Sequence, residues 1–195
     1  MRPRTAVLLG LASALLLAAP AEAWRTSGLH WQTRTIGYFN LAPEYDWSLQ
    51  WAAYVWNASG ANVHFVAVPR ARAQVLVVRK QFPANATEGG IAITRFRSDG
   101  TIVGASVGIA GKLDVYEAAL VAAHEFGHVL GLEHEDRGCA VMNSRLLWDH
   151  PFKCRAPAAG QWWCRLLTSD DIAGAVRIYG GTPRNPARPN CARRA

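Results

Sequence analysis

Hydrophobic positions along the chain repeat with two different periods, which predict strands and helices. Five segments alternate apolar and polar residues or form a dense β-branched run, and we expect strands at 31–39, 63–68, 73–78, 91–96 and 101–109. Between the first two strands, apolar residues recur at intervals of three and four, and they are Leu49, Ala52, Ala53, Val55 and Trp56. This spacing predicts an amphipathic helix, which Asp46 or Ser48 can cap and which ends near Ser59.

Two more helices are predicted from the signals at their ends. Asp114 can cap the first of them, Glu117 completes a capping box three residues later, and good helix formers fill residues 118–130. The polar sequence at 168–171 can cap the last helix, which we expect to run to about Tyr179, where two glycines stop it.

The first 23 residues differ in composition from the rest of the chain. Two arginines precede an apolar segment at 7–19, and small residues at Ala21 and Ala23 complete the layout of a cleavable secretory signal peptide. The alternative is an uncleaved membrane anchor, but the apolar segment is shorter than the roughly 20 residues that span a bilayer. We therefore expect residues 1–23 to be removed before Trp24, leaving a secreted, extracellular protein that no longer associates with the membrane.

The length of 195 residues fits one domain with its own hydrophobic core. We expect this domain at 24–181 and a tail rich in proline and arginine at 182–195. The net charge of +7 is scattered, and no basic face is interleaved with aromatic residues, so the sequence predicts no nucleic-acid partner. A solvated basic surface on a monomer is the simpler expectation.

Four cysteines lie in the C-terminal third of the chain, and they are Cys139, Cys154, Cys164 and Cys191. An even number of cysteines in an oxidising compartment predicts two disulfides, although all three pairings stay open. A metal site made of cysteines alone is disfavoured because no C-x-x-C spacing occurs.

The segment HEFGHVLGLEH, which begins at His124, carries the candidate chemistry. His124 and His128 are four residues apart, so a helix places both imidazoles on one face, where they can bind one metal ion. Gly131 can adopt a positive φ and end the helix, which lets the chain turn back and bring His134 to the same ion. Three histidines leave the fourth position of a zinc site open for water, and Glu125 lies beside them without being needed as a ligand.

This segment also has other interpretations. A bare H-E-x-x-H pattern also occurs on ordinary helices with a solvated charged face, but here five fixed positions match. A closed structural zinc site is disfavoured because such sites are usually completed by cysteine. An inactive domain that keeps the metal site stays open as an alternative.

The same eleven residues resemble the extended zinc motif of the metzincin metalloproteases. The sequence CAVMN at 139–143 is similar to the Met-turn of that family, with Met142 expected beneath the metal. Residues 167–180 resemble the final helix of the matrixins, and residues 89–92 resemble the strand that lines their cleft. The resemblance covers roughly residues 31–181 and identifies the chain as matrixin-like.

This resemblance implies an α+β fold with a twisted, mixed five-stranded sheet, an antiparallel edge strand, an active-site helix, the Met-turn and a C-terminal helix. It implies that the edge strand pairs with the substrate backbone, which makes Gly90, Ile91 and Ala92 candidate substrate-binding residues. It also implies that either Asp170 or Asp171 braces the Met-turn from behind.

The segment after the Met-turn would form the wall of the pocket for the side chain just after the cleaved bond, with Ser144 and Leu146 as candidates. The ligands of the structural zinc and the calcium ions of the matrixins have no obvious counterpart between residues 89 and 114, so we expect a single catalytic Zn²⁺.

The function that this resemblance implies is hydrolysis of internal peptide bonds by a secreted zinc-dependent endopeptidase, with a protein or peptide as substrate. Zinc would lower the pKa of its water and polarise the scissile carbonyl, while Glu125 takes the proton of the water and passes it to the leaving amine. A catalytically silent secreted binding module on the same scaffold is the alternative, which the intact Glu125 disfavours.

Overall fold

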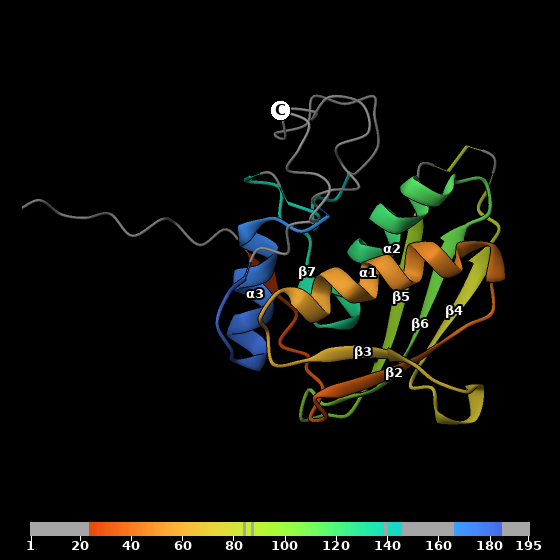
Figure 1. The fold of residues 1–195 in the computed structure, drawn as a ribbon. Helices are drawn as coiled ribbons and strands as arrows, with labels where there is room; N and C mark the ends of the chain where they lie inside the picture. Colours follow the sequence, from red (N-terminus) through yellow and green to blue (C-terminus); the bar gives the residue numbers. More distant parts are fainter. Residues whose placement is uncertain (1–23, 84, 87, 139, 146–165, 185–195) are drawn as a thin grey trace, which may run out of the picture.

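The computed structural model describes residues 24–83, 85–86, 88–138, 140–145 and 166–184, and the elements in this part of the chain follow the predicted order (Figure 1). The predicted elements are β2 (Thr35–Asn40), α1 (Asp46–Ala58), β3 (His64–Ala67), β4 (Val75–Lys80), β5 (Gly90–Phe96), β6 (Ile102–Ala110), α2 (Val115–Val129) and α3 (Ser169–Tyr179). The elements that the hydrophobic pattern did not predict are β1 (Arg25–Thr26), η1 (Pro43–Tyr45), η2 (Arg70–Arg72) and β7 (Leu132–Glu133).

The main sheet has five strands in the order β3-β2-β4-β6-β5. Strands β3, β2, β4 and β6 are parallel, and β5 at one edge runs antiparallel to β6, with Gly90 opposite Ile109 and Thr94 opposite Ala105. Parallel neighbours need a crossover, and α1 supplies the one between β2 and β3. The predicted mixed sheet with an antiparallel edge strand is therefore confirmed.

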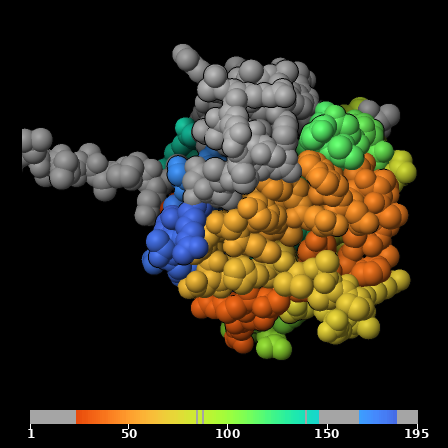
Figure 2. Space-filling view, viewed as in Figure 1, coloured from red at the N-terminus to blue at the C-terminus, as the bar shows by residue number. Residues whose placement is uncertain are grey.

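Helices α1 and α2 pack against each other and against the main sheet. Helix α3 lies beside β7, away from the main sheet (Figure 1). In the space-filling view the surface of α1 (orange) extends from α3 (blue) toward the start of α2 (green) (Figure 2). Phe126 on α2 is fully buried between the two layers, and its ring stacks on Phe65 with centroids 4.4 Å apart. Burying this ring fixes the rotation of α2 about its axis and so decides which residues of the helix face outward.

The ends of the helices confirm most of the predicted caps. The Asp114 side chain accepts hydrogen bonds from the N–H groups of Tyr116 and Glu117, and Glu117 returns one to the backbone of Asp114. Thr168 caps α3, and Gly180 follows its last residue with φ 72°.

The prediction that Asp46 or Ser48 caps α1 was wrong. The helix follows directly from the 3-10 turn η1, in which the carbonyl of Pro43 accepts the N–H of Asp46, and no side-chain cap is found among the described residues. The Ser48 hydroxyl donates instead to the carbonyl of Val115, 2.6 Å away, which ties α1 to the start of α2.

A second, two-stranded sheet joins the beginning of the described chain to the segment after α2. In it, Arg25 pairs with Glu133 and Thr26 with Leu132. The backbone N–H of Ser27 donates to the carbonyl of Gly131 at 2.9 Å, and the indole of Trp31 donates to the carbonyl of Val129 at 2.8 Å. Residues 25–31 therefore hold the turn that follows α2.

Several sequence predictions lie outside the described residues. They are the signal peptide at 1–23, the end of the tail at 185–195, the cysteines Cys139, Cys154, Cys164 and Cys191, and the candidate wall residue Leu146. Among the described helices, none combines the length and the apolar character needed to cross a bilayer.

Candidate metal centre and cleft

Helix α2 and the turn after it bring three imidazoles to one point. The Nε2 atoms of His124 and His128 are 3.0 Å apart, and Nε2 of His134 lies 3.2 Å from the first and 3.1 Å from the second. Tetrahedral zinc with Zn–N bonds of about 2.0–2.1 Å would hold its nitrogen ligands about 3.3 Å apart. The three nitrogens thus lie close to the spacing that one zinc ion requires.

The contacts of Nδ1 in His124 and His128 show which nitrogen of each ring can bind a metal ion. Nδ1 of His124 lies 2.7 Å from the carbonyl oxygen of Val141, and Nδ1 of His128 lies 2.8 Å from that of Leu132. A carbonyl oxygen only accepts, so each Nδ1 carries the hydrogen and each Nε2 of the neutral ring presents a lone pair.

Protonation of these rings is disfavoured. Burial, with the neighbouring His128 as a further cause, lowers the pKa of His124 to about 3, and burial also lowers the pKa of His128. Two lone pairs 3.0 Å apart repel each other unless a cation lies between them. The donor set therefore fits a divalent metal ion, and all three donors are imidazole nitrogens of the kind that zinc accepts.

Gly131 makes the return of the chain possible. Its φ is 92°, as the sequence predicted, and a Cβ atom at this position would lie 2.1 Å from the carbonyl oxygen of Leu29. Both the backbone conformation and the space therefore require glycine. After this turn, β7 runs back past the helix and delivers His134, which is exposed, beside the buried His124.

The turn around Met142 packs directly beneath α2. Met142 is 2% exposed, and a Cβ on Gly127, which lies between the two helical histidines, would be 2.2 Å from its sulfur. Behind the turn, the Asp171 carboxylate accepts the N–H groups of Val141 at 2.9 Å and Met142 at 3.1 Å. Of the two aspartates expected to brace the turn, Asp171 has these contacts.

Asp171 acts on the metal centre through one peptide group. It accepts the N–H of Met142, and the carbonyl oxygen of Val141 in the same peptide group accepts Nδ1–H of His124. Contacts of this kind orient the ligand ring and fix its tautomer. Asp171 is 1% exposed, and burial raises its pKa to about 6 although four hydrogen bonds act in the opposite direction.

Glu125 projects toward the edge strand. A Cβ on Gly90 would lie 2.5 Å from Oε1 of Glu125, so β5 approaches the carboxylate closely where it carries no side chain. Burial raises the pKa of Glu125 to about 8, while a hydrogen bond from the backbone of Ala92 lowers it. Oε2 is buried with no hydrogen-bond partner among the described residues, so one acceptor is left for a ligand or water.

A cleft of about 620 Å³ lies over the three histidines. Its wall includes the predicted Gly90, Ile91, Ala92 and Ser144, together with His124, Glu125, His128 and His134. The remaining lining residues are Ser27, Leu29, Glu88, Gly89, Thr94, Val121, Leu132, Glu133 and Arg145. Because β5 is an edge strand along this cleft, an extended chain would find unpaired backbone groups beside the metal centre.

The sequence prediction missed Ser27 and Leu29 in this wall. Ser27 and Leu29 belong to a stretch that showed no strand period, since β1 has only two residues. Arg145 lines the cleft beside Ser144, within the predicted wall segment.

Comparison with known proteins adds an independent line of evidence. Residues 44–180 match the family described as matrixin. Similar proteins include Matrix metalloproteinase-27 of Homo sapiens, 43% identical over 70 residues that make up 36% of this chain and 12% of that protein. Macrophage metalloelastase of Rattus norvegicus is 34% identical over 71 residues, which cover 36% of this chain and 13% of that protein. Stromelysin-3 of Homo sapiens is 36% identical over 72 residues, which cover 34% of this chain and 12% of that protein. The match thus spans about an eighth of each relative.

Proposed function

The chain belongs to the matrixin family, and on that premise we propose that it is a secreted, zinc-dependent endopeptidase that hydrolyses internal peptide bonds of proteins. The relatives that it resembles carry metalloproteinase or metalloelastase in their names. Their similarity covers only part of this chain, so the proposal depends mainly on the chemistry of the site.

One observation carries the proposal: the Nε2 atoms of three imidazoles converge within 3.2 Å of one another, directly beside a carboxylate whose Oε2 has no hydrogen-bond partner among the described residues. Three protein ligands leave a zinc ion with an open position, which is the composition of a catalytic site rather than a closed structural one. We propose His124, His128 and His134 as the ligands of a single Zn²⁺.

The bound ion would supply a Lewis acid that polarises the scissile carbonyl and acidifies water. Glu125 would accept a proton from the attacking water and return it to the leaving amine. Burial raises the pKa of Glu125 to about 8, and a dication beside the carboxylate would lower it again by favouring the ionised form. Ionised Glu125 is the form that can act as a base.

The substrate would lie along β5. Gly90, Ile91 and Ala92 are proposed to pair with its backbone, and Ser144 to contribute to the wall on the other side of the cleft. Ser144 is held by the Asp136 carboxylate, which accepts its N–H at 2.9 Å and its hydroxyl at 2.8 Å. Backbone pairing selects for extended polypeptide rather than for a particular side chain, which is consistent with a protein substrate.

The test combines metal content with proteolysis on one preparation. We expect about one zinc per chain and cleavage of a quenched peptide library, with Glu125→Gln keeping the zinc and losing at least about 10²-fold in kcat. Glu44→Gln is the matched control, because Glu44 lies on the surface with only a 3.8 Å ion pair to Arg79.

Two outcomes would reject the proposal. A wild-type chain that binds zinc but cleaves no peptide would favour the binding module on the same scaffold. A chain that takes up no zinc would remove the metal centre altogether.

A further inference from the structure

His134 differs from the other two histidines of the metal centre in how it is held. His124 and His128 lie on α2, where the helix itself fixes their backbone. His134 follows a strand of two residues, its side chain is exposed, and the next residues have no regular secondary structure. Neither a helix nor burial therefore fixes the third imidazole, and its position depends on the contacts of the chain on either side.

On the upstream side, the anchor is the short sheet already described. Glu133, the residue directly before His134, pairs with Arg25 of β1. On the downstream side, the backbone N–H of Glu135 donates to the carbonyl of Met142 at 2.9 Å. The third histidine is thus bracketed by one backbone contact on each side.

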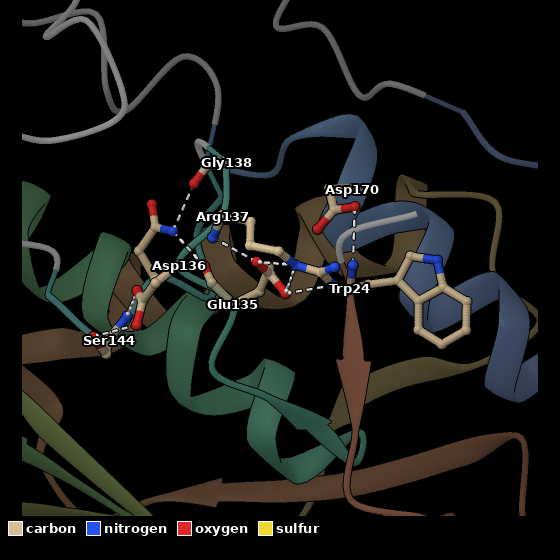
Figure 3. Close-up of polar contacts among 8 residues, drawn as sticks. Trp24, Glu135, Asp136, Arg137, Gly138, Ser144 and Asp170 are labelled. Carbon is tan, nitrogen blue, oxygen red and sulfur yellow. Dashed lines mark hydrogen bonds and ion pairs between the residues drawn. The ribbon is translucent and has the colours of Figure 1, made fainter. Parts of the chain in front are cut away.

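Asn143 reinforces the downstream contact with its side chain. Its amide NH₂ donates to the carbonyl oxygens of Glu135 and, at 2.8 Å, of Gly138, and its amide oxygen accepts the N–H of Ala140 at 3.1 Å. Both kinds of polar atom in the side chain are therefore used, and the residue is 7% exposed. Figure 3 shows these contacts at Glu135 and Gly138, together with the Glu135–Arg137 and Asp136–Ser144 contacts in the same loop.

We propose that Asn143 is a positioning residue of the metal centre, which holds the loop after His134 against the Met142 turn and so sets the third imidazole on the ion. The inference depends on the proposed zinc site. Its physical basis is that two anchors one residue away on either side leave His134 little backbone freedom, so the ring is in place before the metal binds. Removing one anchor makes metal binding responsible for ordering the loop, and that ordering lowers the affinity.

The side chain of Glu135 itself supports the same loop. Its carboxylate is 2% exposed and accepts the N–H of Arg137 and, at 3.2 Å, the guanidinium of the same residue (Figure 3). These contacts shape residues 135–137 but do not reach the Met142 turn. The side chain of Asn143, the residue that follows Met142, contacts both Glu135 and Gly138 and so links this loop to the Met142 turn.

The chain offers a matched control for the experiment. Asn57 makes a similar pair of bonds between the end of α1 and β3, outside the loop after His134, because its amide donates to the carbonyl of Phe65 at 2.8 Å and accepts the N–H of Phe65 at 2.7 Å. Asn143→Asp and Asn57→Asp keep the size of the side chain, keep one acceptor and replace each NH₂ donor with an oxygen that faces a carbonyl. The two variants therefore lose similar bonds in two different places.

The measurement is zinc affinity of the full-length secreted protein by chelator competition, together with the visible spectrum of the cobalt(II)-substituted protein and the unfolding midpoint. For Asn143→Asp we expect the Kd for zinc to rise about tenfold or more, as for other residues that orient metal ligands, with altered cobalt bands. For Asn57→Asp we expect a lower unfolding midpoint, a Kd within about twofold of wild type and unchanged cobalt bands.

Equal zinc affinities and identical cobalt spectra for the two variants would overturn the role of Asn143 while leaving the proposed function intact. A wild-type chain that binds no zinc would overturn both. If Asn143→Asp does not fold, Asn143→Ser removes the amide without setting a charge against two carbonyls, and the same comparison of affinity applies to it.

Discussion

The packing of Met142 beneath α2 predicts an unusual response to Gly127→Ala. In most helix interiors this change stabilises the protein by about 1 kcal/mol, because alanine has the higher helix propensity. Here the new Cβ would lie 2.2 Å from the sulfur of Met142 and 3.2 Å from the ring of Trp56, against a comfortable separation of about 3.5–4.0 Å. Overpacking of this kind costs about 1–3 kcal/mol, and the short distance to sulfur favours the upper end. We expect a net loss of about 2 kcal/mol in the free energy of unfolding.

Repeating Gly127→Ala in a Met142→Ala chain tests whether the contact with Met142 causes the loss of stability. In a Met142→Ala chain the sulfur is gone, and Gly127→Ala should then be neutral or stabilising by up to about 1 kcal/mol. The assay is urea unfolding of the four proteins of this double-mutant cycle at one saturating zinc concentration. The expected coupling energy is about 2–3 kcal/mol, since the overpacking cost is removed with Met142 while the gain in helix propensity stays. Equal destabilisation by Gly127→Ala in both backgrounds would refute the contact as its cause.

Three further predictions follow from the same contacts. Gly131→Ala should lower zinc affinity and cost at least about 1–2 kcal/mol of stability, because the φ of 92° and the nearby carbonyl of Leu29 leave no room for a side chain. Chelator competition would measure the affinity and urea unfolding the stability. Asp171→Ala should destabilise the protein by about 3 kcal/mol or more and weaken zinc binding, because it leaves the N–H groups of Val141 and Met142 buried without an acceptor. An unfolding midpoint near that of the wild type would contradict this. The pKa of His124 is lowered in the folded protein, so without zinc the unfolded chain binds more protons than the folded one between about pH 6.5 and 3. The free energy of unfolding should therefore fall as the pH drops through this range. Unfolding experiments at a series of pH values would check this, and His124→Ala should remove part of the slope.

Periodicity was enough to predict the main sheet and its helices, because each of these elements is long enough to bury a repeating face. The alternation at 91–96 and the capping box at Asp114 are local features, and the structure has β5 and the start of α2 there. The start of α1 was misplaced because η1 leads directly into it. A turn that takes over the role of a cap leaves no side-chain signal in the sequence.

The candidate metal centre was predictable for a different reason. The spacing of His124 and His128 is set by the helix repeat, and the position of Gly131 implied the turn that returns His134. The cleft around these residues was only partly predictable, because its walls come from segments far apart in the chain. Ser27 is brought there by pairing with Gly131, more than one hundred residues later, and two-residue strands have no detectable period.

The contacts of the three histidines indicate which part of the site depends on the metal. His124 and His128 are locked by helix α2 and by Nδ1–H bonds to Val141 and Leu132, so their Nε2 lone pairs face each other at 3.0 Å whatever else binds. Nε2 of His134 lies 3.2 and 3.1 Å from these two atoms. When a chelator removes the ion, the exposed His134 is the ring that can move away most easily, because its movement breaks no helix hydrogen bond. The loop at 134–138 should therefore be the first segment to lose amide protection from hydrogen exchange on zinc removal, while the amides of α2 near Phe126 keep theirs. Zinc would then stabilise the folded chain in proportion to its binding free energy, while the Asn143 contacts to Glu135 and Gly138 limit how far this loop opens without the ion.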